Sequence, residues 1–296
     1  MTVSDAYNKF LRAKQLRGFS PKTIDSYRCF LPPFIRFVGD SIDISTLNTD
    51  IALDYIQTLF TRPLADATRA TYVRHLKVFL RWLKEKYNVF FDLTEIVIPK
   101  TGKKVVHLLS PDEVMKLFSS VSSKIGWIQL RNYAILSLML DSGLRQGEIV
   151  SLLWCNVDYS RKIALVCGKG KKERYIPLGE FSIDCLSKYR QACPFKSEYV
   201  FVGRRGEHIT GNAVKLFVQK LRKTSGIDFS SHKLRHNFAT NYVIDSLERT
   251  GQCDVFTLQA LMGHESAKTT EVYLHQAAAM VALKNNHSHL DGIMGV

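Results

Sequence analysis

The sequence predicts a mainly α-helical protein with one small β-hairpin, arranged as two domains. Three observations support this prediction. Apolar residues recur at helical spacing along most of the 296-residue chain. A stretch rich in proline, glycine and lysine, residues 96–104, breaks that period. Two short β-like runs farther on flank a glycine- and lysine-rich tip. The predicted division is a helical domain over 1–92, a linker over 93–107 and a second domain over 108–296.

The first domain is predicted to be a small bundle of helices. Its helices begin at polar capping residues or at a proline, and they carry apolar stripes. Ser20 followed by Pro21, for example, is a cap with proline at the first helical position. Pro32 and Pro33 are expected to bend the second helix. The four helices are predicted over residues 5–14, 22–38, 48–59 and from 66 onward.

The fourth predicted helix has one apolar face and one basic face. Its apolar residues, such as Leu76 and Leu80, recur at the spacing of a buried stripe. The basic residues between them are expected to face outward and to contact DNA phosphates: Arg69, Arg74, Lys77 and Arg81. A basic face that is only solvated is the alternative.

The second domain is predicted to open at a capping box, in which Ser110 is followed three residues later by Glu113. An apolar segment then predicts a buried helix that ends at Gly143 and presents Arg145. The two β-like runs, residues 162–166 and 174–177, form the hairpin. Helices are predicted over 127–140, from about 148, and over 181–191, 212–224, 233–247, 256–261 and 276–284.

The composition indicates a soluble protein with a polyanionic partner. No apolar run approaches the roughly 20 residues needed to span a bilayer, so no membrane contact is expected. The start lacks a signal-peptide pattern, which predicts a cytoplasmic location. Lys and Arg exceed Asp and Glu by 14, and the residues up to 104 hold 17 basic against 10 acidic side chains. Both domains are therefore basic, as expected of two domains that grip one duplex.

The residues suited to chemistry gather near the end of the chain. His232 and Arg235 lie three residues apart, and His264 follows 29 residues later. Guanidinium groups bind phosphoryl oxygens through paired hydrogen bonds. No paired carboxylates nearby suggest magnesium ligands, and six scattered cysteines without a CxxC pair do not suggest zinc, so no metal or other cofactor is expected. Tyr273 is the predicted nucleophile; its ordinary pKa near 10 means that it needs cations and a base around it.

Four motifs occur in order and at suitable spacing along most of the chain. They are Ser142-Gly143-Leu144-Arg145-Gln146-Gly147-Glu148, the Gly168-Lys169-Gly170 hairpin ending in Ile176-Pro177-Leu178, His232-Lys233-Leu234-Arg235-His236, and Gly263-His264 through to Tyr273. With these motifs the chain resembles the tyrosine recombinases of the phage integrase family, and its two-domain layout is similar to that of Xer-type members.

The resemblance implies a role for each matching residue. Arg145 and Arg235 would hold the scissile phosphate, and Lys169 on the hairpin would protonate the leaving 5′-hydroxyl, with Lys171 and Lys172 as nearby alternatives. His232 would act as acid and base, and His264 would hydrogen-bond the phosphate. Tyr273 would form a covalent 3′-phosphotyrosyl link, and Glu148 would orient the residues that touch the phosphate. Tyr175, Tyr242, His236 and His275 are interpreted as structural or peripheral.

The resemblance also implies an architecture and partners. A helical, SAM-like core-binding domain and a mixed α/β catalytic domain would form a C-shaped clamp on a double-stranded DNA core site. Four protomers would join two such sites and pass through a Holliday junction, without ATP or a metal. A type IB topoisomerase-like relaxase shares this chemistry and is the nearest alternative, and a catalytically silent DNA-binding regulator is the other.

Two segments depart from a compact Xer-like layout or lack a clear role. Residues 245–254 are longer than a short turn needs, and they are interpreted as a surface insertion. The apolar tail around 290–296 is expected to dock either on a neighbouring protomer or on its own domain. The sequence names neither an accessory protein nor the DNA sequence that is recognised.

Overall fold

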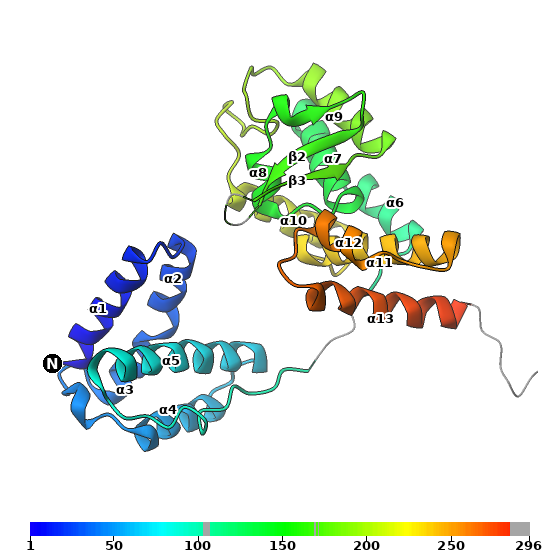
Figure 1. Cartoon of the computed structure of the whole chain (residues 1–296). Helices are drawn as coiled ribbons and strands as arrows, with labels where there is room; N and C mark the ends of the chain where they lie inside the picture. Colours follow the sequence, from blue (N-terminus) through cyan, green and yellow to red (C-terminus); the bar gives the residue numbers. More distant parts are fainter. Residues whose placement is uncertain (103–106, 169, 171, 285–296) are drawn as a thin grey trace, which may run out of the picture. The chain divides into compact units, whose positions relative to one another are not determined.

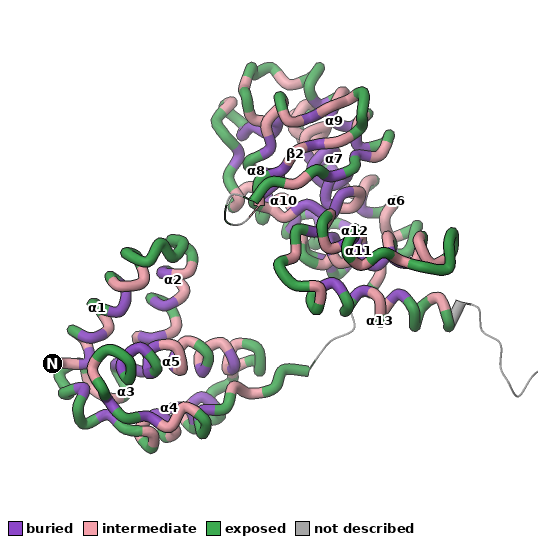
Figure 2. Tube along the Cα trace, viewed as in Figure 1, coloured by how far each residue is buried: buried purple, intermediate pink, exposed green. Residues whose placement is uncertain are grey.

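The computed structural model describes residues 1–102, 107–168, 170 and 172–284 (Figure 1). Contacts divide the chain into two compact units, Met1–Lys104 and Val105–Val296. Each unit has its own buried core, and in both units the buried positions line the inward faces of the helices (Figure 2). The predicted class, mainly helical with a small sheet, is confirmed.

The regular elements in the described residues of the first unit are all helices. Phe10 lies at its centre, where its ring contacts those of Tyr27, Phe79 and Trp82 at centroid distances of 4.9, 5.3 and 5.5 Å. Edge-on packing of this kind adds to the stabilisation from burial alone. The helices are α1 (Val3–Leu16), α2 (Pro21–Phe30), α3 (Pro32–Val38), the short 3-10 helix η1 (Ile44–Thr46), α4 (Thr49–Thr61) and α5 (Asp66–Tyr87).

Two predictions for the first unit need correction. The second predicted helix is two helices, because Pro32 and Pro33 lack the N–H groups that would continue the hydrogen bonds of α2. The predicted linker begins too early, since Ile96 is fully buried in the core of the first unit. Packing of the first unit therefore extends beyond residue 92.

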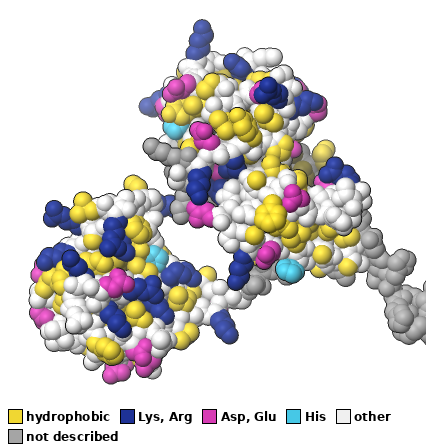
Figure 3. Space-filling view, viewed as in Figure 1, with side chains coloured by type: hydrophobic (Ala, Val, Ile, Leu, Met, Phe, Trp, Pro, Cys, Tyr) yellow, Lys and Arg dark blue, Asp and Glu magenta, His cyan; other side chains and the backbone are white. Residues whose placement is uncertain are grey.

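The basic face of α5 differs from the prediction at two of its four positions. Arg69 is only 13% exposed and donates hydrogen bonds to the carbonyls of Leu59 and Leu64. Lys77 donates to the carbonyl of Ile96 over 2.8 Å. These two cations stabilise the unit itself, because they satisfy carbonyls that would otherwise lack partners. Arg74 and Arg81 are exposed as predicted, and Figure 3 shows Lys and Arg side chains over the visible face of this unit.

The second unit is built around the helix α7 (Gly126–Asp141), in which residues 134–139 are all buried. A three-stranded antiparallel sheet in the order β1-β2-β3 contributes to the same core, with Leu165 of β2 opposite Tyr175 of β3. The other elements are α6 (Pro111–Ser119), α8 (Gln146–Ser151), η2 (Trp154–Asn156), β1 (Val157–Asp158), β2 (Ile163–Cys167), β3 (Glu173–Pro177), α9 (Glu180–Ala192), α10 (Gly211–Ser225), α11 (Ser231–Thr250), α12 (Val255–Met262) and α13 (Ala267–Lys284).

Three local features of the second unit bear on the sequence predictions. The capping box at Ser110 and Glu113 is confirmed. The predicted insertion over 245–254 is mostly helix, because α11 continues to Thr250 and ends at Gly251 in the left-handed conformation. Tyr175, interpreted from the sequence as structural, is 63% exposed. The predicted tail docking falls on residues outside the described ranges.

Within the described part of the chain, no helix is long and apolar enough to cross a membrane. The six cysteines, all in described positions, carry free thiols.

Candidate active site

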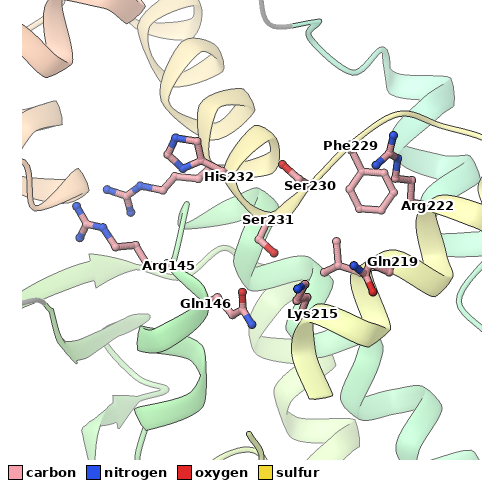
Figure 4. Close-up of a pocket in the computed structure, with 11 residues that line it drawn as sticks. Arg145, Gln146, Lys215, Gln219, Arg222, Phe229, Ser230, Ser231 and His232 are labelled. Carbon is pink, nitrogen blue, oxygen red and sulfur yellow. The ribbon is translucent and has the colours of Figure 1, made fainter. Parts of the chain in front are cut away.

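A tight turn before α8 presents Arg145. Gly143 has φ of +57°, and a Cβ atom there would overlap the ring of Phe238, so only glycine fits. The hydroxyl of Ser142 donates to the carbonyl of Pro177 over 2.7 Å, which fastens the turn to the end of β3. The backbone of Arg145 is extended, and its side chain is 36% exposed. Its guanidinium is directed toward the site (Figure 4).

Glu148 is the buried carboxylate of the site, with 3% of its surface exposed. Oε1 accepts from Nη1 of Arg145 at 2.9 Å and from Nη1 of Arg174 at 2.7 Å. Oε2 accepts from the backbone N–H of Arg145 at 2.8 Å and from Nη2 of Arg174 at 2.9 Å. Four hydrogen bonds fill the accepting capacity of a carboxylate. Burial by itself raises the pKa of Glu148, but the hydrogen bonds and charges of Arg174 and Arg145 outweigh it, and the pKa is lowered.

Arg235 lies on α11 and is almost fully buried. Its Nη1 donates to the carbonyl of Gly143 over 2.6 Å, and its Nη2 donates to the carbonyl of Met262. Desolvation, followed by the charge of Arg145, lowers the pKa of Arg235 to about 10. The guanidinium therefore stays protonated at neutral pH, next to the turn that carries Arg145.

Three consecutive carbonyl groups at the end of α12 each accept a hydrogen bond from a different arginine. Leu261 accepts from Nε of Arg174 at 2.7 Å. The carbonyl of Met262 accepts from Arg235, and the carbonyl of Gly263 accepts from Arg145 at 2.9 Å. The C-terminal carbonyls of a helix lack partners in the helix and carry partial negative charge. The end of α12 thus gathers the three guanidinium groups beside Glu148.

His264 follows the end of α12 directly. Gly263, with φ of +59°, reverses the chain, and the N–H of His264 donates to the carbonyl of Gln259 at 3.2 Å. Nδ1 of His264 lies 2.9 Å from the hydroxyl of Thr270. Desolvation, then the charges of Arg235 and Arg145, lower the pKa of His264 to about 4, so the imidazole is neutral at pH 7.

Tyr273 lies in the middle of α13 and is 2% exposed. Its ring packs between α11, α12 and α13 with Val243, Leu258 and Met262. The ring stacks on His264 at 6.0 Å, with 14° between the planes. Burial raises the pKa of Tyr273, although the charges of Arg235 and Arg145 act to lower it. The Tyr273 hydroxyl is therefore buried and protonated at neutral pH, so its ionisation would require a base.

His232 and His236 connect the first turn of α11 to Tyr273. The rings of His232 and His236 are 4.6 Å apart, and the ring of His236 is 5.1 Å from that of Tyr273. Desolvation and the charges of Arg235 and Arg145 lower the pKa of His232, while desolvation and His232 lower the pKa of His236 to about 4. His236, interpreted from sequence as structural, thus lies between the two predicted catalytic residues.

A pocket of about 440 Å³ opens where these elements meet (Figure 4). Arg145 and His232 lie on one side of it, and Lys215 and Arg222 of α10 lie on the other. The first turn of α11, which contains no acidic residue, borders the pocket at Ser231. An opening with several cations and helix N–H groups suits an anionic ligand.

The structure brings together five of the six predicted catalytic residues and Glu148. Lys169 is the exception, because it lies outside the described residues. Lys172, an alternative on the same hairpin, lines a second pocket of about 870 Å³ together with Arg145 and His264. Sequence reasoning missed Arg174, although the strand pattern placed it at the start of the second β-run. Among the described residues, no group of three His, Cys, Asp or Glu side chains could hold a metal ion.

Replacing Gly263 with alanine is expected to weaken both the fold and the site. The left-handed conformation costs a non-glycine residue about 1–2 kcal/mol, and the new Cβ would lie 3.1–3.3 Å from the Arg174 side chain. Gly251→Ala is the matched control, since Gly251 has φ of +71° and a Cβ added there would meet nothing within 4 Å. Denaturant unfolding should show the larger loss for Gly263→Ala; equal losses would contradict the contact with Arg174.

Acidification is expected to destabilise the second unit between pH 6.5 and pH 4. The pKa of both His236 and His264 falls from 6.5 to about 4 on folding, so the unfolded chain binds more protons in this window. Their contribution to stability is therefore complete above pH 6.5 and is lost as the pH falls toward 4. Urea midpoints measured across this range should decrease, and the slope should be smaller in His264→Gln. An unchanged slope in this variant would show that His264 does not titrate as described.

Comparisons with known proteins agree on one group. The sequence profile of the phage integrase family matches residues 107–280. A tyrosine recombinase XerC from Pediococcus pentosaceus is 32% identical over 289 residues, which cover 93% of each chain. A tyrosine recombinase XerC from Lacticaseibacillus casei is 30% identical and covers 95% of this chain and 96% of its own.

Solved structures show a similar fold. The XerH site-specific recombinase bound to its palindromic difH substrate matches with a TM-score of 0.72 and 21% identity, covering 95% of this chain and 84% of the other. A lambda integrase dimer bound to a COC′ core site matches with a TM-score of 0.71 and 20% identity, covering 92% and 95%. At these identities the likeness concerns the fold.

Proposed function

This chain belongs to the phage integrase family of tyrosine-type site-specific recombinases, and from that premise we propose that it cuts and rejoins double-stranded DNA through Tyr273. The observation that carries the proposal is the convergence of Arg145, Arg235, His264 and Tyr273 from four separate segments. Arg145 and Arg235 line the basic pocket and donate to carbonyls at the end of α12. His264 follows that end, and its ring stacks on the ring of Tyr273. Two arginines held at fixed positions suit the charge of a phosphate in its transition state.

The proposed reaction is a transfer at phosphorus. The hydroxyl of Tyr273 attacks the scissile phosphate and passes its proton to a base, a role that falls to His232. The bond between phosphorus and the 5′ oxygen breaks, and Lys169 gives a proton to that oxygen. A 3′-phosphotyrosyl bond replaces the bond that was lost, so no nucleotide hydrolysis is needed. Attack by the 5′-hydroxyl of a partner strand then reverses these steps and joins the new strands.

In this scheme, Arg145, Arg235 and His264 donate hydrogen bonds to the nonbridging oxygens of the phosphate. Arg145 and Arg235 are fixed by protein carbonyls, so they need little rearrangement when the charge on phosphorus develops. The pKa of His264 is lowered to about 4, so His264 enters as a neutral imidazole that can donate one hydrogen bond. Glu148 fixes Arg145 through both its backbone and its side chain.

The proposed partner is a DNA core site, which both basic units would contact. Exposed Arg74 and Arg81 are the residues of α5 that we assign to phosphate contacts. Strand exchange by this chemistry needs two sites and four active tyrosines, so we propose a tetramer of this chain on two sites. Because its proposed substrate is DNA, we propose that the chain acts in the cytoplasm, at the nucleoid.

Covalent capture tests the proposal. DNA cross-linked to the protein by its own reaction is recovered from cells under denaturing conditions and sequenced, and the recovered site is then offered as a nicked suicide duplex. The expected result is a covalent adduct that maps to one strand position. If no DNA is captured covalently in cells, the chain is a DNA-binding regulator; relaxed circles without hybrid recombinant products would indicate a relaxase. The comparisons support neither alternative.

A further inference from the structure

We propose that Arg174 is a positioning residue for the recombination reaction. Arg174 holds the Glu148 carboxylate, which in turn fixes Arg145, and Arg174 also joins β3 to the end of α12. This inference rests on the proposed function, because it concerns how the same site is kept in a reactive arrangement. Arg174 does not need to touch the DNA for this role. Its effect would pass to the phosphate through Glu148 and Arg145.

The first support is the geometry of the ion pair. Nη1 and Nη2 of Arg174 donate to the two oxygens of Glu148 at 2.7 and 2.9 Å, and only 11% of the Arg174 side chain is exposed. A guanidinium in this paired arrangement sets the plane of the carboxylate as well as its distance. The orientation of the carboxylate in turn sets the position of the Arg145 side chain, because Oε1 accepts hydrogen bonds from both arginines.

The second support is the contact with α12. Nε of Arg174 donates to the carbonyl of Leu261 over 2.7 Å, two residues before Gly263, whose carbonyl accepts from Arg145. The side chain of Arg174 also lies against Gly263, where an added Cβ would approach it to 3.1 Å. One side chain therefore contacts Glu148 and the segment that leads to His264 at the same time.

The third support is that the pair is buried. Two charges removed from water are often no more stabilising than apolar residues of the same volume. Removing only Arg174 would leave the Glu148 carboxylate with the two hydrogen bonds from Arg145. The carboxylate is then free to turn toward Arg145 and to draw its guanidinium away from the phosphate. The expected consequence is a defect in reaction rate that is larger than the defect in DNA affinity.

The test compares Arg174→Gln and Arg174→Lys with the wild-type chain on a suicide duplex that carries the captured site. Gln removes the charge and the fork, whereas Lys keeps the charge alone. Both variants should bind DNA within about threefold of wild type but form adducts more slowly, by about 10–100-fold for Gln, as is usual when a residue that orients an active group is lost. Arg190→Gln is the control, because this exposed arginine on α9 packs over Trp154 instead.

A duplex with a methylphosphonate at the scissile position separates positioning from general damage. This neutral group does not require Arg145 to balance a negative charge, so the rate defect of Arg174→Gln should shrink to within about threefold of wild type. The double variant Glu148→Gln/Arg174→Gln should be no slower than the slower single variant, because the two residues act as one unit.

Several results would overturn the inference. Wild-type adduct rates in both Arg174 variants would do so, as would an equal defect on phosphate and methylphosphonate, since both indicate a purely structural residue. If Arg174→Gln does not fold, judged by its thermal transition, the Lys variant carries the same comparison. Failure of the proposed function is distinguishable, because then the wild-type chain itself forms no adduct.

Discussion

Replacing Tyr273 with phenylalanine is expected to abolish covalent protein–DNA adducts while leaving DNA binding unchanged. The variant removes only the hydroxyl, so no oxygen remains on this side chain to form the bond to phosphorus. The ring packs in the interior with Leu258 and Met262, and phenylalanine fills the same space. The free energy of unfolding should therefore change by less than about 1 kcal/mol. Denaturing gels of the suicide-substrate reaction measure the adduct, and gel shifts measure binding.

The control for this variant is Tyr242→Phe. Tyr242 lies on the same helix as Arg235 and packs at the edge of the same cluster, but it is interpreted as structural. This control should form adducts at the wild-type rate. An adduct that persists in Tyr273→Phe would rule out Tyr273 as the nucleophile, whatever the result for Tyr242.

Replacing Arg235 with lysine is expected to slow adduct formation by about 10²–10³-fold, the usual cost of losing one donor to a developing oxyanion. Lysine keeps the charge, but it cannot reach the carbonyls of Gly143 and Met262 and also face a phosphate. A buried carbonyl left without a partner costs about 1–3 kcal/mol of stability. Single-turnover rates and urea unfolding measure the two effects separately.

Arg190→Lys, made on an exposed helix of the same unit, is the matched control for this change. It should alter neither the rate nor the urea midpoint appreciably. A folded Arg235→Lys protein that forms adducts as fast as wild type would contradict the assignment of Arg235 to the phosphate. A loss of stability alone would show that Arg235 serves the fold and not the reaction.

Local signals in the sequence predicted local structure well. The capping box at Ser110 and Glu113 and the proline at the start of α2 act within one helical turn, so their effects can be predicted without the rest of the fold. The extent of a helix was harder to predict. The helix α11 continues to Thr250, into the segment interpreted as an insertion, because nothing between 247 and 250 prevents helical backbone.

A position on the polar face of a helix did not predict which atoms a long side chain contacts. Arg69 and Lys77 have the positions of a solvated face on α5, yet both reach backbone carbonyls of neighbouring segments. These acceptors are main-chain atoms, which every residue has, so no pattern of side chains reveals them. The same reason applies to one partner of Arg174, the Leu261 carbonyl. Its other partner is a carboxylate 26 residues away, which no local pattern places beside it.

The motifs placed the candidate site residues in one unit, but they gave no indication of their environment. Sequence reasoning treated Tyr273 as a nucleophile at the end of the chain. In the structure it lies in the interior of a helix whose neighbours bury it. Burial depends on the packing of α11, α12 and α13 together, which the spacing of the motifs does not specify.

The three carbonyls at the end of α12 allow the cost of gathering three guanidinium groups to be met during folding, before any ligand binds. Three guanidinium groups held near one another repel, and gathering them in solution would also cost conformational entropy. Here that cost is met when the chain folds, because Leu261, Met262 and Gly263 already provide partial negative charge. In the proposed reaction, a DNA phosphate would meet Arg145 and Arg235 already in place, and more of its binding free energy would remain to stabilise the transition state.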